Sequence, residues 1–311
     1  MDSQSTSSSV PASWTALLRR HAQEHVMTTR GLAVALGLVV LLLGQGVVRA
    51  LAGDEIALRA ALIGGFAGFA TTALGAMPAL VLRTIPQKLQ DSLLGFAAGM
   101  MLAASAFSLL LPGLEAGAEI LGHKGLGAAV VVAGMAVGVV LMLGLDEFTP
   151  HEHDTTGPCG AGHERCGRAW LFVFAIALHN LPEGMAIGVS FANGDLSVGL
   201  PLTTAIALQD IPEGLAVALA LRAAGFRPLV AVAVAAASGI LEPLGALMGV
   251  SLSSGLAPAY PLGLGLAAGA MIFVVSHEVI PETHRNGHQT PATLGLMAGF
   301  ALMMVLDTTL G

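Results

Sequence analysis

Charged residues are scarce in this chain of 311 residues. Lys, Arg, Asp and Glu make up only 11% of the sequence, whereas hydrophobic residues make up 55% and the mean hydropathy is +0.79. These values lie well outside the range of soluble globular domains. The scarcity of charge therefore excludes a soluble domain and indicates a protein that crosses a membrane several times.

Cysteines and basic tracts are scarce as well. The two cysteines, Cys159 and Cys166, share one polar loop and could pair with each other or bind a metal, but two are too few for a disulfide framework. The net charge is -7 and no long basic run occurs, so we expect no nucleic-acid partner. The expected surroundings are a lipid bilayer.

Nine apolar runs follow one another, each near the ~20 residues that a membrane helix needs. They cover residues 31–48, 57–82, 92–112, 126–145, 170–192, 198–221, 229–253, 261–280 and 291–307. We therefore expect an all-α polytopic membrane protein. Threading the runs through a bilayer places ten of the 13 Lys and Arg residues on one side, which should be cytoplasmic. The protein should then lie in the plasma (inner) membrane with its carboxyl terminus outside.

The first run decides the domain organisation. Residues 1–30 have the composition of a solvated cytoplasmic tail. Residues 31–52 predict an additional transmembrane helix, although 50–52 (ALA) resemble a cleavage site and leave a cleaved signal as the alternative. Residues 53–311 form the main membrane domain, which contains a His-rich cytoplasmic loop at 147–169.

Two copies of one polar pattern lie inside apolar runs at the centre of the chain. Residues 176–184 (IALHNLPEG) are echoed by residues 206–214 (IALQDIPEG). Ionisable residues inside a membrane normally face a protein interior or an aqueous path and have a function. An isolated His or Glu could merely make an interhelical hydrogen bond, but this does not account for two copies of the pattern.

These residues are suited to binding a metal ion. His179 and Glu183 share a helix face, while Pro182 and Pro212 should bend their helices and expose carbonyl oxygens. The predicted ligands are His179, Asn180, Glu183, Gln209, Asp210, Glu213 and, from a third proline-containing helix, Glu242. Four carboxylates without Lys or Arg in these runs favour a divalent cation such as zinc, iron, manganese or cadmium. This ion should be exchangeable cargo, and no catalytic cofactor is expected.

Weak internal repeats flank the centre. Residues 95–101 (GFAAGMM) align with 265–271 (GLAAGAM), and 141–146 (LMLGLD) with 302–307 (LMMVLD), in runs of opposite direction. Inverted repeats around a polar centre are typical of secondary transporters that work by alternating access.

The paired motifs, with the Glu-Pro of residues 242–243, resemble the signature helices of the ZIP family of divalent-metal transporters, notably its bacterial GufA-like branch. The resemblance covers roughly residues 55 to 311. It implies an eight-helix 3+2+3 core, import of zinc or related ions into the cytoplasm, movement of helices 1-4-5-6 against 2-3-7-8, and a homodimer. The helix at 31–52 would be an addition to that core.

The resemblance also implies two metal sites between the fourth and fifth helices. The first would use His179, Glu183, Gln209 and Glu213, with Met101 as a further ligand. The second would use Asn180, Asp210 and Glu242 and share Glu183, Gln209 and Glu213. The assignment of these ligands to two separate sites comes from the resemblance and not from the spacing of the residues.

Further residues mark the two ends of a path. His277 and Glu278 lie near the cytoplasmic end of their run and could receive departing metal, or could simply form a polar helix end. Asp146 lies directly before the His-rich loop, in which the resemblance suggests an exit or regulatory site at His151 and His153. On the opposite side, Ser108 and Asp307 are entrance candidates by analogy with the family.

Two other functions compete with transport by a carrier. An intramembrane metallohydrolase could use a His/Glu centre to activate water, but the H-E-x-x-H motif is missing, since Pro281 stands where the second His should follow His277-Glu278. A passive cation channel is the third possibility, because the sequence does not separate channel from carrier kinetics. We therefore expect a transport protein and not an enzyme.

Overall fold

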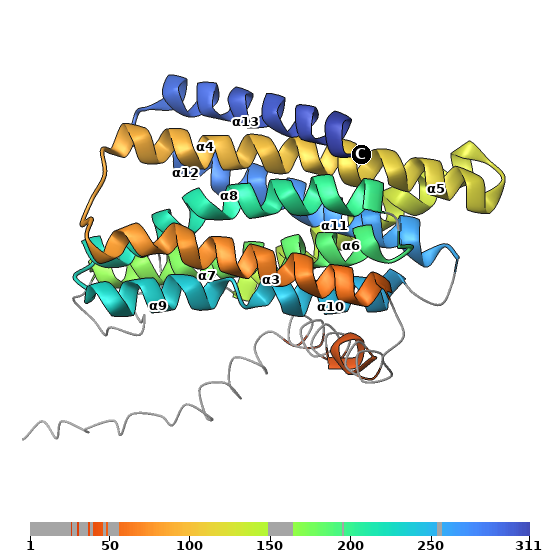
Figure 1. Ribbon diagram of the computed structural model, residues 1–311, viewed down its shortest axis with the longest axis horizontal. Coiled ribbons are helices and arrows are strands. Elements are labelled where there is room, and N and C mark those ends of the chain that lie inside the picture. The colour runs from red at the N-terminus through yellow and green to blue at the C-terminus, as the bar shows by residue number, and fades with distance from the viewer. Residues whose placement is uncertain are drawn as a thin grey trace, which may run out of the picture.

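Every element in the described part of the chain is a helix (Figure 1). The computed structural model describes residues 56–148, 164–194, 196–253 and 257–311, with scattered positions between Val26 and Val48. The elements are α3 (Ile56–Ala76), η1 (Met77–Leu80), α4 (Gln87–Ala104), η2 (Ser105–Leu110), α5 (Leu111–Leu121), α6 (Lys124–Phe148), α7 (Glu164–Phe191), α8 (Leu196–Ala223), α9 (Pro228–Ser238), α10 (Leu241–Ser253), α11 (Ala259–Val274), η3 (Val275–Val279), α12 (Ile280–His284) and α13 (Gln289–Leu310). The predicted all-α class is confirmed.

Within the described residues, seven segments are long and apolar enough to cross a membrane. They are Ile56–Leu80, Gln87–Leu121, Lys124–Gly144, Leu196–Ala223, Pro228–Ser253, Ala259–His284 and Gln289–Leu310. Each contains most of one predicted apolar run, and the run at 170–192 falls largely within α7, which is 28 residues long. The run at 31–48 is described only in part, at residues that are helical. Of these, Leu42 packs against Met185, Met248 and Leu266.

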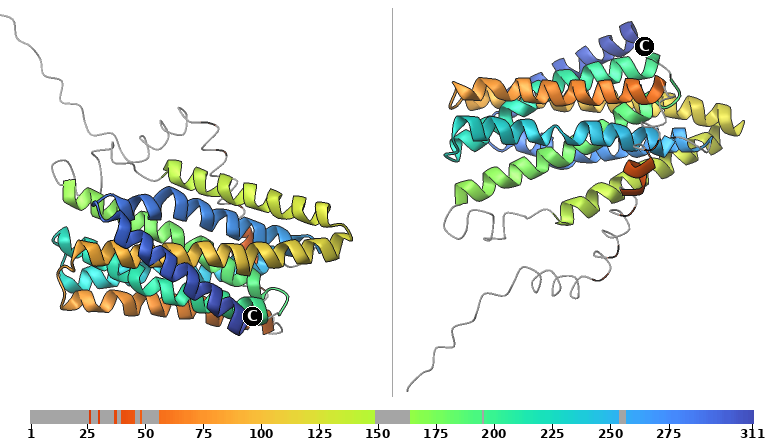
Figure 2. Two further views of the ribbon diagram at one scale, coloured as in Figure 1. Left: turned by 90° about the horizontal axis from the view of Figure 1, so that it is seen from above. Right: turned by 60° about the horizontal axis from the view of Figure 1, so that its bottom comes forward.

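The helices run along one long axis of the molecule. α13 and α4 lie along one side of the bundle, α9 and α10 along the other, and α8 between them (Figure 1). A second view shows α13 crossing α4 obliquely and α6 lying beside α11 (Figure 2). The motif helices α7 and α8 contact each other and are both packed within this bundle.

The packing of α4 on α13 is repeated by that of α11 on α6. A Cβ atom at Gly95 would lie 2.2 Å from the carbonyl oxygen of Ala292, and one at Gly265 would lie 2.2 Å from that of Val131. Glycine is needed at both places because the helix backbones approach too closely for a side chain. The aligned segments of the sequence thus make equivalent contacts.

The two motif helices also pack equivalently. A Cβ atom at Gly184 would lie 2.1 Å from the carbonyl oxygen of Glu242, on α10, and one at Gly214 would lie 2.2 Å from that of Thr72, on α3. Since Gly184 and Gly214 end the two copies of the motif, Thr72 occupies on α3 the position that Glu242 occupies on α10.

The two motif prolines lie inside helices. Pro182 and Pro212 fall within the continuous helices α7 and α8, and the predicted bends at these positions remain predictions. The run at 229–253, by contrast, is interrupted at residues 239–240, between α9 and α10. Tightly packed neighbouring helices can keep a proline-containing helix continuous.

Two π-helical segments, η2 and η3, were not predicted. They occupy equivalent places, between α4 and α5 and between α11 and α12. Pro112 and Pro281 stand just after them and lack the N–H group that a regular helix would use. Short π segments inside α-helices occur frequently at functional sites.

Candidate metal centre

All seven predicted ligands are buried, none with more than 2% of its surface exposed: His179, Asn180, Glu183, Gln209, Asp210, Glu213 and Glu242. Three helices supply them, because α7 and α8 each carry one copy of the motif and Glu242 lies in the first turn of α10. The close contacts between these helices bring the polar residues into one region.

Glu183, Asp210 and Glu213 form the densest part of this region. One carboxylate oxygen from each lies within 4.8 Å of the others. The side-chain amide of Gln209 donates a hydrogen bond to Oε1 of Glu183. Among the described residues, Oε2 of Glu183 and both oxygens of Glu213 have no hydrogen-bond partner. Buried carboxylate oxygens without donors are unfavourable, and a divalent cation bound between them would compensate their charge.

Asp210 and Glu242 converge on α3. The hydroxyl of Thr72 donates a hydrogen bond to Oε1 of Glu242 at 2.9 Å. One turn earlier, a Cβ atom at Gly68 would lie 1.5 Å from Oε2 of Glu242 and 3.1 Å from Oδ2 of Asp210. Sequence reasoning missed this wall of the site, because glycine and threonine do not stand out in a helix rich in small residues.

His179 connects the centre to η3. Its Nε2 atom lies 3.1 Å from Oε2 of Glu278 and forms an ion pair with it when the imidazole is protonated. The sequence predicts that Glu278 lies on the exit path, and the structure brings it into direct contact with a predicted ligand. The neighbouring His277 instead stacks on Phe273, with ring centroids 4.9 Å apart.

The entrance candidates lie together. The hydroxyl of Ser108, in η2, donates a hydrogen bond of 2.7 Å to Oδ1 of Asp307, near the end of α13. The two residues are 199 positions apart in the chain. The structure thus brings the two entrance candidates together, and their role stays a prediction.

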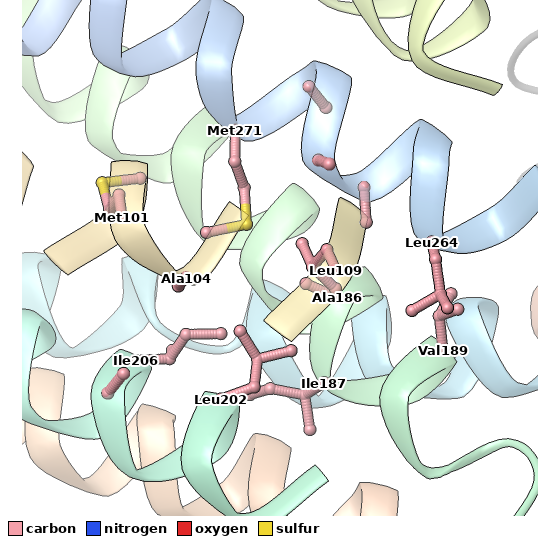
Figure 3. Packing of buried hydrophobic residues seen from close by; sticks show 14 of the residues in the cluster. Met101, Ala104, Leu109, Ala186, Ile187, Val189, Leu202, Ile206, Leu264 and Met271 are labelled. Carbon is pink, nitrogen blue, oxygen red and sulfur yellow. The ribbon is translucent and has the colours of Figure 1, made fainter. Parts of the chain in front are cut away.

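The other candidates remain predictions. Met101 is fully buried in the apolar cluster that also contains Ile206 and Met271 (Figure 3). Asp146 lies in α6 close to its end, but its side chain falls outside the described part of the structure. His151 and His153 also lie outside the described residues.

A polar cluster at the start of α4 was not anticipated. Asp91 is 1% exposed and accepts hydrogen bonds from Gln87 at 2.9 Å and Asn286 at 3.2 Å, while Nδ1 of His288 lies 2.8 Å from its other oxygen. Both carboxylate oxygens therefore have partners. The cluster ties α4 to the turn between α12 and α13.

These membrane-length helices define an integral membrane protein, and they enclose a buried cluster of carboxylates that could bind a metal ion. The sequence profile described as "ZIP Zinc transporter" matches residues 149–307. The chain belongs to the ZIP family of zinc transporters. The resemblance seen in the motifs is thereby confirmed, as is the expectation that the chain is not an enzyme.

Several relatives match most of the chain. It is 64% identical over 291 residues to the zinc transporter ZIPB of Bordetella bronchiseptica, covering 93% of this chain and 94% of the relative. It is 44% identical over 256 residues to the zinc transporter GufA of Myxococcus xanthus, covering 81% and 99%. The zinc transporter ZIP11 of Homo sapiens is 31% identical over 332 residues, covering 81% and 97%.

Proposed function

We propose that this protein transports divalent metal ions, zinc foremost, into the cytoplasm through a binuclear centre inside the membrane. The observation that supports the proposal is the cluster of Glu183, Asp210 and Glu213, whose buried oxygens lie within 4.8 Å of one another. Three carboxylates at this separation repel one another unless cations or protons compensate their charge. The names of the relatives favour zinc as the cation.

In this proposal the ligands form two sites, each of which binds one ion. His179, Glu183, Gln209, Glu213 and Met101 hold the first ion. Asn180, Asp210 and Glu242 hold the second and share Glu183, Gln209 and Glu213 with the first. The unpartnered oxygens of Glu183 and Glu213 support a bridging role, since each residue has at least one buried oxygen available to an ion.

The path runs from an outer pair to an inner series of residues. Zinc enters beside Ser108 and Asp307, binds at the centre, and leaves past His277 and Glu278 towards Asp146, His151 and His153. The contact of 3.1 Å between His179 and Glu278 supports this order, because an ion released by His179 has a second ligand next to it. It also joins α7 to η3, which belong to the two helix groups proposed to move during alternating access.

The arrangement in the membrane is part of the proposal. The tail at 1–30 is cytoplasmic, residues 31–52 form a retained span, and residues 53–311 form the transporter domain. The packing of Leu42 against α7, α10 and α11 supports a retained helix. The family resemblance adds a homodimer, which light scattering of the detergent-solubilised protein tests.

Zinc uptake by vesicles that contain the purified protein tests this function. Glu213→Ala and His179→Ala should each lower the initial rate about tenfold or more, because each removes a ligand from a buried site. Glu119→Ala, which alters an exposed acid on α5, serves as the matched control and should leave the rate unchanged. Rates like the wild type in both ligand variants would show that the site is wrongly assigned.

The same vesicles test the transport mechanism, and labelling of intact cells tests the orientation. Uptake should saturate with zinc concentration, whereas a non-saturating conductance would indicate a channel. In intact cells an impermeant thiol reagent should fail to label Cys159, in the loop proposed as cytoplasmic, and Cys166, in the first turn of α7 on the same side. Labelling from outside would invert the proposed orientation.

A further inference from the structure

α3 provides no charged ligand, yet one of its side chains holds a ligand of the second site. Thr72 is 2% exposed, and its hydroxyl donates a hydrogen bond of 2.9 Å to Oε1 of Glu242, 170 positions further along the chain. Oε2 of Glu242 is buried and has no hydrogen-bond partner among the described residues. The backbone of Gly68 lies against that oxygen. Oε1 of Glu242 is therefore held by the hydrogen bond from Thr72, and Oε2 is available to a metal ion.

Thr72 and Glu242 occupy equivalent positions in the two halves of the molecule. Gly184 packs against the backbone of Glu242, and Gly214 packs against that of Thr72 in the same way. A second pair of glycine contacts agrees with this equivalence. Three residues further on, Cβ atoms at Gly75 and Gly245 would lie 2.1 Å and 2.4 Å from carbonyl oxygens of α8 and α7, respectively. One half of the repeat thus has a carboxylate where the other has a hydroxyl, and the two groups bond to each other.

We propose that Thr72 is a positioning residue that keeps Glu242 a one-oxygen ligand and thereby favours Zn²⁺ over larger ions such as Cd²⁺ at the second site. The inference rests on the proposed function, because it requires metal at Glu242. Zn²⁺ prefers about four ligands at short distance, whereas larger cations take more ligands and accept both oxygens of a carboxylate. The hydrogen bond from Thr72 takes one lone pair of Oε1 and fixes the orientation of the carboxylate, so binding of one ion through both oxygens requires the carboxylate to turn.

The neighbouring Thr71 supplies a comparison on the same helix. Its hydroxyl lies 2.9 Å from the carbonyl oxygen of Gly68 and 3.0 Å from that of Ala67, and it lies 3.3 Å from Oδ2 of Asp210, the other second-site ligand that faces α3. The hydroxyl of Thr72 lies 3.1 Å from the carbonyl oxygen of Gly68 but nearer to Glu242. Thr71→Val therefore makes the same chemical change but removes the longer contact with Asp210 and keeps the bond to Glu242.

The test is the ratio of zinc to cadmium uptake, measured from initial rates and KM values in vesicles containing the full chain. Thr72→Val should lower the ratio about tenfold, mainly by raising the KM for zinc, because the lost bond involves a charged acceptor. Thr72→Ser keeps the donor and should stay within about twofold of the wild type. Thr71→Val should change the ratio less than Thr72→Val, because its contact with Asp210 is longer than the bond between Thr72 and Glu242.

A wild-type ratio in Thr72→Val would overturn the proposed role of Thr72. If that variant does not fold, Thr72→Ala against Thr72→Ser carries the same comparison, since both side chains are smaller than threonine. Glu242→Ala separates this inference from the proposed function. Normal transport of both metals by Glu242→Ala would show that Glu242 is not part of a metal site. Impaired transport by Glu242→Ala, together with a wild-type ratio in the Thr72 variants, would reject only the positioning role of Thr72.

Discussion

The carboxylates of the centre differ in the donors that surround them. Glu183 and Glu242 each have one oxygen that accepts a side-chain hydrogen bond, from Gln209 and Thr72, respectively. Neither oxygen of Glu213 has a partner among the described residues. Glu213 should therefore depend most on a bound cation, since a charged oxygen with no donor gains the most from one. This is why its removal is the principal test of the site.

Gly68 offers a test of the second site that leaves every ligand in place. Gly68→Ala would put a Cβ atom 1.5 Å from Oε2 of Glu242, so that this carboxylate must move. The neighbour is the end of a flexible side chain, so we expect zinc uptake to fall about tenfold with little change in thermal stability. Gly144→Ala, with nothing within 4 Å of the added Cβ atom, is the control. Normal uptake in Gly68→Ala would contradict this geometry.

Pairs of helices are held together by contacts between backbones. α7 on α10 and α8 on α3 use glycines of the two motif copies, and α4 on α13 and α11 on α6 use glycines of the aligned flanking segments. In a membrane, where no hydrophobic force drives helices together, such close approach supplies the packing energy. The glycines of the motifs thus have a structural role beside the ligands.

Gly184→Ala should act on stability in a way that Gly68→Ala does not. The added Cβ atom would lie 2.1 Å from the backbone carbonyl oxygen of Glu242, which cannot rotate away, so α7 and α10 must separate. We expect a loss of roughly 1–3 kcal/mol, visible as a melting temperature several degrees lower in detergent. Gly144→Ala again serves as the control. A melting temperature equal to the wild type would mean that this contact is looser than described.

The internal repeats of the molecule make the residues at the two ends of the proposed path equivalent. When the alignment of 95–101 with 265–271 is continued, Ser108 in η2 corresponds to Glu278 in η3. The alignment of 141–146 with 302–307 pairs Asp146 with Asp307. The bonded pair of Ser108 and Asp307 at one end therefore has Glu278 and Asp146 as its counterpart at the other. Equivalent ends are what alternating access by inverted repeats requires.

The sequence predicted much of this arrangement. Eight of the nine apolar runs fall on described helices, and the seven predicted ligands stood out because polar and ionisable residues are rare in membrane spans. Thr72 did not stand out, since its role depends on a contact with Glu242 that local spacing does not encode. The π segments were missed because a proline indicates an irregularity but not its type.

The most direct test of a binuclear carboxylate centre is the number of zinc ions that the purified protein binds. Glu213→Ala should bind about two fewer ions per chain than the wild type, because both sites use Glu213, and Glu242→Ala about one fewer. The comparison cancels zinc bound by the His-rich loop, which all three proteins share. Equal zinc content in Glu213→Ala and the wild type would contradict the account.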